Sequence, residues 1–181
     1  MSFHQQLTLW LKADDVRCLA LRQAAELGLP DWCIAAGFVR NLVWDRLHDY
    51  AKPTPLADID LIYFNAKDIS EEADRTLEQR LRQESNLLWS VKNQARMHVR
   101  NGDVPYLNTL DAMSYWPELE TAVGIRLAPD ESFISPFPLE SLSHLQITLN
   151  PKRPKIADFE ARILEKKWLE TWPKLKVNKA Y

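Results

Sequence analysis

Two aspartates on one predicted strand are the residues of this chain that are best placed to do chemistry. Asp58 and Asp60 flank Ile59 and are followed by Leu61 and Ile62, so the apolar pattern predicts a largely buried β-strand. Side chains two positions apart on a strand point to the same face. Burying ionised carboxylates is costly unless a counter-charge is supplied. A divalent cation would supply that charge, and Mg²⁺ prefers carboxylate and phosphate oxygens.

A glycine ahead of these acids predicts a phosphate-binding turn. Gly37, one of four glycines in the chain, lies between a short apolar strand predicted at 32–36 and a helix predicted at 38–50. A glycine lets a ligand approach the backbone closely, and the first amides of a helix donate to phosphate. Arg40, about one turn into the helix, is able to reach back toward the same anion.

Each of these features also has a purely structural interpretation. Gly37 would then make a tight turn with Arg40 on a solvated helix face, and Asp58 and Asp60 would be solvated acids at an exposed strand end. Their order favours chemistry, because a glycine turn, an inward-set arginine and an acid pair together make a phosphate cradle that faces a metal site. Such a site suits in-line phosphoryl or nucleotidyl transfer.

A second polar cluster follows the next predicted strand, which covers residues 87–91. Its members are Lys92, Asn93, Arg96 and His98. They would bind the triphosphate, the base or the acceptor beside the metal, or they would make structural hydrogen bonds at the edge of the sheet. The sequence leaves both interpretations open for Lys92 and Arg96, whereas for His98 the structural one is the more ordinary.

The elements that must position these residues alternate between helix and strand. Apolar periodicity predicts two helices within residues 1–28, with Asp14 as the N-cap of the second and Gly28 as its stop. A charged amphipathic helix is predicted over 69–85, and Asn108 is a candidate N-cap for a later helix. The remaining elements are predicted as more strand at 94–99, short strands at 123–127 and 132–135 joined by a hairpin turn at 129–131, and helices at 139–145 and 157–169.

This pattern indicates an α/β (α+β) fold, a small mixed sheet flanked by helices. We expect an N-terminal helical segment at 1–30, a core at 31–100 and a C-terminal mixed extension at 101–181, packed together as one unit. Seven tryptophans are present, and the four at helix-packing positions are expected in the core rather than stacked on a ligand. These four are Trp10, Trp44, Trp116 and Trp168.

Composition and charge narrow the class of protein. The 181 residues are 46% apolar and 27% charged, which is ordinary for a globular protein, and the net charge of −2 argues against a general electrostatic nucleic-acid binder. Residues 151–181 nevertheless carry nine Lys and Arg against four Asp and Glu, so a basic helix near phosphate and a solvated helix face both stay open.

No apolar stretch approaches the length of a membrane span, and no secretory signal is evident. Cys18 and Cys33 lack metal-ligand spacing, so they are predicted to be small buried hydrophobes in a reducing compartment. We therefore expect a cytoplasmic protein that does not contact a membrane.

The sequence also resembles the polymerase-β-like nucleotidyltransferase superfamily. Residues 36–41, followed by the Asp-Ile-Asp-Leu run at 58–61, resemble the pattern Gly-Gly-x-Val-Arg-Asp before an Asp-x-Asp strand in its tRNA-terminal-adding and poly(A)-polymerase branch. More specifically, the chain is similar to a family of small bacterial predicted nucleotidyltransferases over most of its length. The segments that carry this likeness include 58–64, 91–98, 111–117 and 123–127.

The resemblance implies a polymerase-β-like nucleotidyltransferase fold and a set of site residues. Asp58 and Asp60 would be the catalytic residues and the Mg²⁺ ligands. Gly37 and Arg40 would contact the triphosphate of the donor, which is ATP or another nucleoside triphosphate (NTP). Further candidates for nucleotide binding are Asn41, Lys92, Asn93 and Arg96.

The chain departs from the superfamily pattern at three points. Ala36 replaces the first glycine, and Asn41 replaces an acid. The superfamily also places a third carboxylate on the next core strand, where it helps to deprotonate the acceptor hydroxyl. Here that strand contains Ser90 and Lys92 on one face and no acid. This difference bears on catalysis more than on nucleotide binding.

The first hypothesis is therefore a Mg²⁺-dependent nucleotidyltransferase that acts on an unidentified acceptor, either a small molecule or a protein. The second is a degenerate nucleotide-binding or protein-interaction module that kept the fold and lost turnover, which the missing third acid favours. The third, an enzyme that modifies nucleic-acid ends through the basic tail, ranks lowest because the chain is slightly acidic and lacks a long helical extension.

Overall fold

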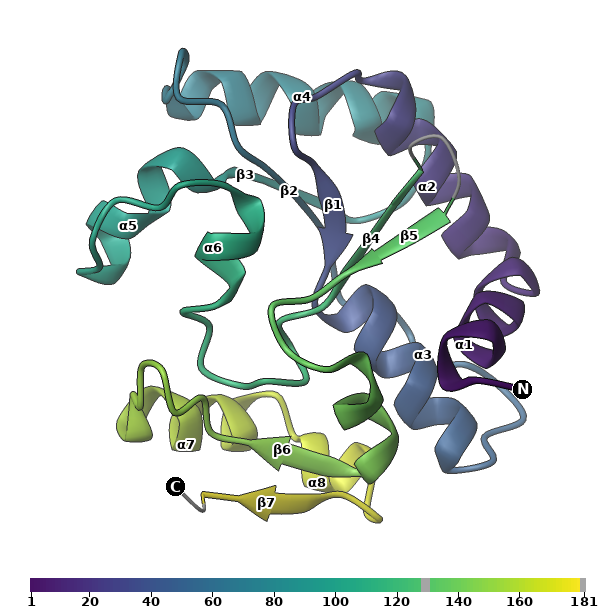
Figure 1. Cartoon of the computed structure of the whole chain (residues 1–181). Helices are drawn as coiled ribbons and strands as arrows, with labels where there is room; N and C mark the ends of the chain where they lie inside the picture. The colour runs from purple at the N-terminus through teal and green to yellow at the C-terminus, as the bar shows by residue number, and fades with distance from the viewer. Residues whose placement is uncertain (128–130, 180–181) are drawn as a thin grey trace.

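A five-stranded mixed sheet forms the centre of the computed structural model, which describes residues 1–127 and 131–179 (Figure 1). The strands lie in the order β3-β2-β1-β4-β5; β2 and β3 pair in parallel and the other neighbours pair antiparallel. Their bounds are Cys33–Ala35 for β1, Ile59–Tyr63 for β2, Trp89–Asn93 for β3, Gly124–Leu127 for β4 and Glu131–Ile134 for β5. The predicted small mixed sheet is confirmed.

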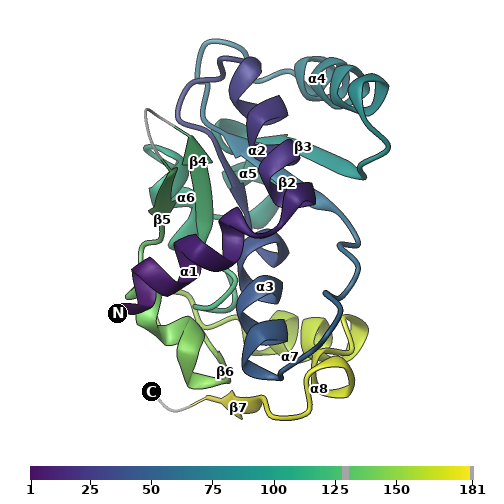
Figure 2. The same cartoon turned by 90° about the vertical axis from the view of Figure 1, so that its right-hand side faces the viewer.

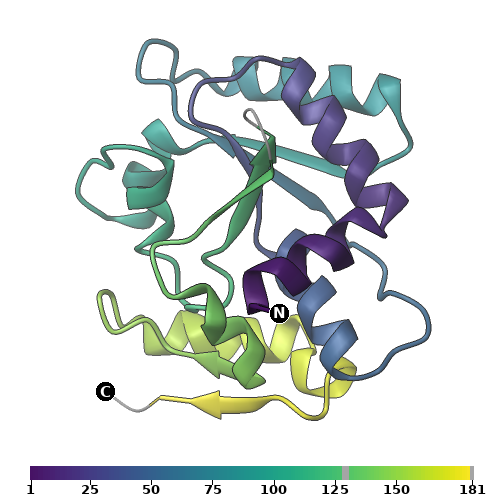
Figure 3. The same ribbon diagram turned by 45° about the vertical axis from the view of Figure 1, so that its right-hand side comes forward.

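Two N-terminal helices, α1 (Phe3–Lys12) and α2 (Asp15–Glu26), begin and end where the sequence predicts. The Asp14 side chain accepts a hydrogen bond from the backbone N–H of Arg17 at 3.0 Å, which satisfies one free amide of the first turn of α2. Gly28 has a φ of +60°, a left-handed conformation that suits glycine and turns the chain toward β1. Figure 3 shows both helices, in purple, crossing one side of the sheet.

Four helices cover one face of the sheet. Besides α1 and α2 these are α3 (Gly37–Leu47) and α4 (Glu71–Glu84). The large core lies between them and the strands, because alternate strand residues point to this face. Its members from the sheet include Ile34, Ile59, Leu61, Tyr63, Trp89, Val91 and Ile125.

The opposite face of the sheet carries a smaller apolar cluster. Here Cys33, Ala35 and Ile62 pack with Met113 and Ala122. Helices α5 (Gln94–Asn101) and α6 (Thr109–Met113) lie on this side, and the structure confirms Asn108 as the N-cap of α6. Less of this face is covered by apolar packing, which leaves room for a site.

The prediction of more strand at 94–99 is wrong, since these residues form α5. The strand stops at Asn93, whose side chain accepts from the backbone N–H of Ala95 at 3.1 Å and so caps a helix. The Gln, Ala, Arg and Met that follow favour a helix over a strand.

The C-terminal elements form a separate layer below the sheet in Figure 1. They are the 3-10 helix η1 (Leu139–His144), β6 (Gln146–Thr148), α7 (Ile156–Glu165), α8 (Trp168–Thr171) and β7 (Lys176–Asn178). The helix predicted at 157–169 is two helices, because Lys167 adopts a left-handed φ of +52° between them. Strands β6 and β7, a parallel pair of three residues each, were not predicted, since elements this short have no readable periodicity.

Helix α3 joins this layer to the sheet, as Figure 2 shows. Its Trp44 is fully buried in a third apolar cluster with Trp168 and Trp172. The Asp45 carboxylate accepts from the Trp172 indole N–H at 2.8 Å, and His48 Nε2 accepts from the backbone N–H of Lys174 at 2.9 Å. Both ends of the chain therefore fix the helix that follows the glycine turn.

The predicted hairpin of β4 and β5 is present as an antiparallel pair. Residues 129 and 130 of its predicted turn lie outside the described residues. Within the described residues, no helix has both the length and the apolar character needed to cross a bilayer.

Replacing Gly124 with alanine should destabilise the fold. A Cβ at this position of β4 would lie 2.6 Å from the buried Cys33 Sγ and 3.2 Å from the Ile34 carbonyl oxygen. We expect Gly124→Ala to lower the free energy of unfolding by about 1–3 kcal/mol through overpacking, measured by urea denaturation. Gly37→Ala is the matched control, since its Cβ would meet nothing closer than 3.4 Å. Equal effects of the two substitutions would contradict this account.

Candidate active site

A cleft of about 510 Å³ opens at the less covered face of the sheet. Its walls come from β2, β3, α5, the segment 115–117 and α7, so the core and the C-terminal layer both contribute. Its polar lining includes Asp60, Lys92, Thr121 and Arg162. Clefts of this size typically bind small molecules and cofactors.

Asp60 lies at the inner end of this cleft, on the central part of the sheet. It pairs with Ala35 of β1 on one side and with Ser90 of β3 on the other. Burial, and to a smaller extent the charge of Asp58, raise the pKa of Asp60 to about 6, although a hydrogen bond with Ser90 and the charges of Lys166 and Arg40 act in the opposite direction. The carboxyl thus sits where negative charge is poorly compensated.

Asp58 precedes β2 and is exposed, and it does not line the cleft. The strand predicted for both acids therefore holds only Asp60, although the charge of Asp58 still acts on Asp60. Across residues 1–127 and 131–179, neither acid has an ion-pair partner. The two acids that the sequence singles out therefore form an uncompensated negative site.

The turn before α3 has an unusual backbone. Ala36 adopts φ 57° and ψ −122°, a conformation that disfavours residues with a Cβ, and its N–H donates to the Val123 carbonyl at 2.8 Å. Gly37 has no such requirement, because an added Cβ would meet only the Asn41 and Arg40 side chains at 3.4–3.6 Å. The strain therefore falls on Ala36, the residue that replaces the first glycine of the superfamily pattern.

Arg40 is buried rather than exposed to the cleft, with 6% of its surface accessible. Its guanidinium lies 4.8 Å from the ring centre of Trp44 and 4.4 Å from that of Trp168. It donates to Thr121 Oγ1 at 2.6 Å and to Asn41 Oδ1 at 3.0 Å, and its buried Nε has no partner. Burial lowers the pKa of Arg40 to about 10. Arg40 thus holds Thr121 and Asn41 in place beside the turn.

Asn41 extends over Gly37 at the start of α3. Its Oδ1 is used by Arg40, and its Nδ2 lies 3.4 Å from where a Gly37 Cβ would be. The predicted residues Gly37, Arg40 and Asn41 are therefore in mutual contact. An amide donor directed past a glycine is suited to an anion such as phosphate.

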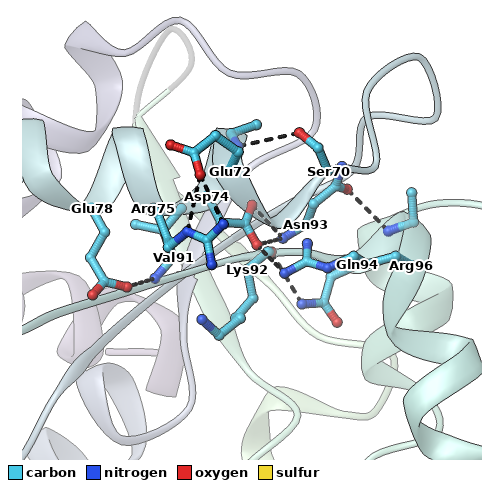
Figure 4. A network of polar contacts seen from close by, with 12 residues as sticks. Ser70, Glu72, Asp74, Arg75, Glu78, Val91, Lys92, Asn93, Gln94 and Arg96 are labelled. Carbon is cyan, nitrogen blue, oxygen red and sulfur yellow. Dashed lines mark hydrogen bonds and ion pairs between the residues drawn. The ribbon is translucent and has the colours of Figure 1, made fainter.

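The predicted cluster after β3 divides into two groups, shown in Figure 4. The Lys92 side chain points away from the hydrogen-bond network and lines the cleft, and within the described residues its ammonium has no hydrogen-bond or ion-pair partner. Asn93 and Arg96 instead belong to a network around the buried Asp74, which accepts from the backbone N–H of Asn93 at 3.1 Å and pairs with Arg96 at 2.6 Å.

Asn93 also ties the loop after β2 to the sheet. Its side-chain amide donates to the carbonyls of Asn65 and Asp68, both at 2.8 Å, and it is fully buried. His98 contacts the ring of Tyr106 and lies within hydrogen-bond distance of the Ala95 carbonyl at 3.1 Å. These contacts leave Lys92 as the member of the cluster that faces the cleft.

Sequence reasoning missed the polar segment that precedes β4. Glu118 is fully buried and pairs with Arg162 of α7 at 2.7 Å, and Thr121 lines the cleft while it accepts from Arg40. The available signal was the alternation of acids with other residues at 118–121, directly before an apolar run. Arg162, the partner of Glu118 on α7, is 44 residues away in the sequence, so no local pattern predicts this contact.

The chain is similar to proteins of known family and structure. A family model described as nucleotidyltransferase matches residues 22–177. A solved structure described as an NMR structure that reveals a CCA-adding enzyme head domain is 32% identical, with a TM-score of 0.86, over 97% of this chain and 96% of that chain. No curated protein matches significantly.

A second solved structure is described as tRNA-processing enzyme complex 3. It is 19% identical with a TM-score of 0.55, and the match covers 88% of this chain and 43% of that one. At this identity the likeness concerns the fold alone.

Replacing Ala36 with glycine should stabilise the protein. Relief of the strained φ and ψ outweighs the backbone entropy that glycine loses on folding, so we expect Ala36→Gly to raise the free energy of unfolding by about 1 kcal/mol in denaturant titration. The control is Ala35→Gly in β1, where no strain is relieved and glycine destabilises through backbone entropy and the loss of a buried methyl group. If both substitutions destabilise alike, Ala36 is not strained.

Glu120 should make stability depend on pH. Burial raises the pKa of this carboxyl to about 7, well above its value of about 4.3 in an unfolded chain, although Thr148 donates to it twice. The folded state therefore binds the proton more tightly than the unfolded chain does. Above pH 7 the ionised Glu120 lowers the free energy of unfolding, and this loss is recovered as the pH falls toward 4.5.

We expect Glu120→Gln to be more stable than the native chain at pH 8 and the difference to shrink between pH 7 and 4.5, measured by urea denaturation. The exposed Glu140→Gln is the control and should show no such trend. A difference for Glu120→Gln that is independent of pH would contradict the assignment.

Proposed function

The chain belongs to the nucleotidyltransferase family that its sequence matches, and on that premise we propose that it transfers a nucleoside monophosphate from an NTP to an acceptor with Mg²⁺ as cofactor. The observation that carries this proposal is the Asp60 carboxyl in the cleft, which has no ion-pair partner within the described residues, with the exposed Asp58 two residues before it. Asp58 acts electrostatically on Asp60, and neither has a cationic side chain as partner within the described residues.

The acid pair fits a cation, since two carboxylates that repel each other are stabilised together by one divalent ion. Asp58 and Asp60 would hold it. Within the described residues no group of three or more His, Cys, Asp or Glu side chains is placed to hold a metal, so phosphates and water would complete the coordination. When bound, Mg²⁺ neutralises charge on the phosphates and orients the attacking oxygen.

We assign binding of the triphosphate to the start of α3 and to β3. The backbone at Gly37 is open to a ligand, Asn41 Nδ2 is directed over it, and Lys92 offers an unpaired ammonium from the cleft floor. Arg40 acts behind them as a positioning residue, because its donors are occupied by Thr121 and Asn41. A direct role for Asn93 and Arg96 stays a prediction, and their contacts with Asp74 argue for a structural one.

The transfer itself requires the acceptor oxygen to attack the α-phosphorus while the bond to pyrophosphate breaks and pyrophosphate leaves. We propose that residues 31–100 and 101–181 act as one unit, since both line the cleft. The acceptor is expected to be a small molecule or a protein side chain rather than a nucleic acid, because the cleft is small and the net charge is negative. We place the reaction in the cytoplasm, where free thiols such as Cys18 and Cys33 are ordinary.

A second candidate function is nucleotide binding without turnover. This alternative is favoured by β3, whose residues 89–93 contain no acid. Asp60 pairs there with Ser90, where the superfamily has a third carboxylate. In this form the chain would bind an NTP and signal its presence through a protein contact.

Removing the acid pair tests the first proposal. With labelled NTP, Mg²⁺ and cell extract as the source of acceptor, the native chain should release pyrophosphate, and the double substitution Asp58→Asn and Asp60→Asn should reduce the rate at least about a hundredfold. Thermal unfolding should be preserved in the double variant. Asp68→Asn, which changes an exposed acid outside the cleft, is the control.

The proposal fails if the double variant retains the native rate. If the native chain binds NTP in calorimetry yet releases no pyrophosphate with any extract, the non-catalytic function takes its place.

A further inference from the structure

We propose that Trp116 is the platform on which the nucleobase of the donor NTP stacks, an inference that rests on the proposed function. The lining of the cleft is chemically mixed. Beside its charged and hydroxyl groups it includes a set of apolar side chains from four different segments. These are Ile62 of β2, Met97 of α5, Trp116, Pro117 and Ala161 of α7.

A cleft with both apolar and charged lining suits a nucleotide, because its base is planar and weakly polar while its phosphates are charged. Trp116 supplies a large flat surface, and the flexible Met97 side chain, which also lines the cleft, is able to adapt to a ring. Stacking on an aromatic side chain suits any base, so this platform would bind the donor without selecting among the four bases.

Two aromatic residues line the cleft, and their surroundings differ. The ring of Tyr115 is already in use, with the Lys152 ammonium 3.9 Å from its centre and the ring of Tyr106 at 5.3 Å. Within the described residues no aromatic ring or cation stacks on Trp116, and its half-buried indole has an N–H with no protein partner. Trp116 was expected to be a core residue, and the structure places it at the boundary between core and cleft.

The backbone that carries Trp116 is held rigidly. The fully buried Asn150 donates from its side-chain amide to the carbonyl of Ser114 at 2.8 Å and to that of Trp116 at 2.7 Å. The backbone N–H of Asn150 donates to the Pro117 carbonyl at 2.9 Å. A platform fixed in advance binds a ring with little loss of conformational entropy.

Trp116 lies on the same side of the sheet as Asp60. It packs against the cluster that contains Ile62, and Ile62 is two residues beyond Asp60 on β2, so the side chains of Asp60 and Ile62 point to the same face. All three residues line the one cleft.

Calorimetric titrations with ligands that have or lack a base test this inference. The native chain with Mg²⁺ should bind ATP about tenfold more tightly than ribose 5′-triphosphate, which has no base. Trp116→Leu should lose about tenfold in ATP affinity and keep its affinity for ribose 5′-triphosphate, and Trp116→Phe should retain most of the ATP affinity. Trp10→Leu, at another half-buried tryptophan that lies outside the cleft, should change neither.

A second measurement needs no variant. Photolabelling the native chain with 8-azido-ATP should modify the peptide that contains residues 115–117 or Met97, as identified by mass spectrometry. Label confined to other segments, equal native affinities for the two ligands, or equal losses for both in Trp116→Leu would overturn the inference. If the native chain binds neither ATP nor ribose 5′-triphosphate, the proposed function itself fails, which is a distinct outcome.

Discussion

The burial of Arg40 between Trp44 and Trp168 is the interaction on which the rest of the site depends. The guanidinium contacts both rings and donates to Thr121, so one side chain joins α3, the C-terminal layer and the segment before β4. A buried arginine is costly unless its donors are used, and here aromatic faces and two hydrogen-bond acceptors compensate most of that cost. Because of this contact, the C-terminal layer helps to hold the turn that precedes α3 in place.

The position of Asp60 in the cleft sets it apart from the other buried acids. Asp74 pairs with Arg96 and Glu118 pairs with Arg162, whereas Asp45 and Glu120 accept hydrogen bonds from neutral groups and lie outside the cleft. Asp60 has no basic partner within the described residues, lines the cleft, and has a pKa that burial and Asp58 raise. Removing a partner from a buried charge is strongly unfavourable, so an unpaired carboxyl at the end of a cleft indicates a ligand that supplies the opposite charge.

The strained turn at Ala36 shows how a departure from a motif is accommodated. The backbone keeps a conformation that suits glycine, and the hydrogen bond from Ala36 to Val123 fixes it against β4. The neighbouring Gly37 is under no such steric demand, because an added Cβ would meet only the side chains of Asn41 and Arg40 at ordinary contact distances. The structural need for a glycine therefore falls on position 36, and the proposed phosphate contact falls on position 37.

The sequence by itself determined the elements and motifs whose causes are local. Caps at Asp14, Gly28 and Asn108, the alternation in β2 and the glycine turn act over a few residues, so their consequences are visible without a fold. The small mixed sheet and the family resemblance were predicted from patterns of the same local kind, whereas the order of the strands was not. The closeness of Asp58 and Asp60 also has a local cause, because the two residues are two positions apart.

Only the tertiary structure decided what surrounds those motifs. Arg40 and Thr121 are 81 positions apart, and Asp45 and Trp172 are 127 apart, so no periodicity announces their contacts. For the same reason Asn93 and Arg96 proved to belong with Asp74, whereas α7 became a wall of the cleft. Helices and strands are predictable because they depend on steric and hydrogen-bond preferences between residues that are close in the sequence. The partners of each buried polar group are not, because they depend on which distant segments pack together.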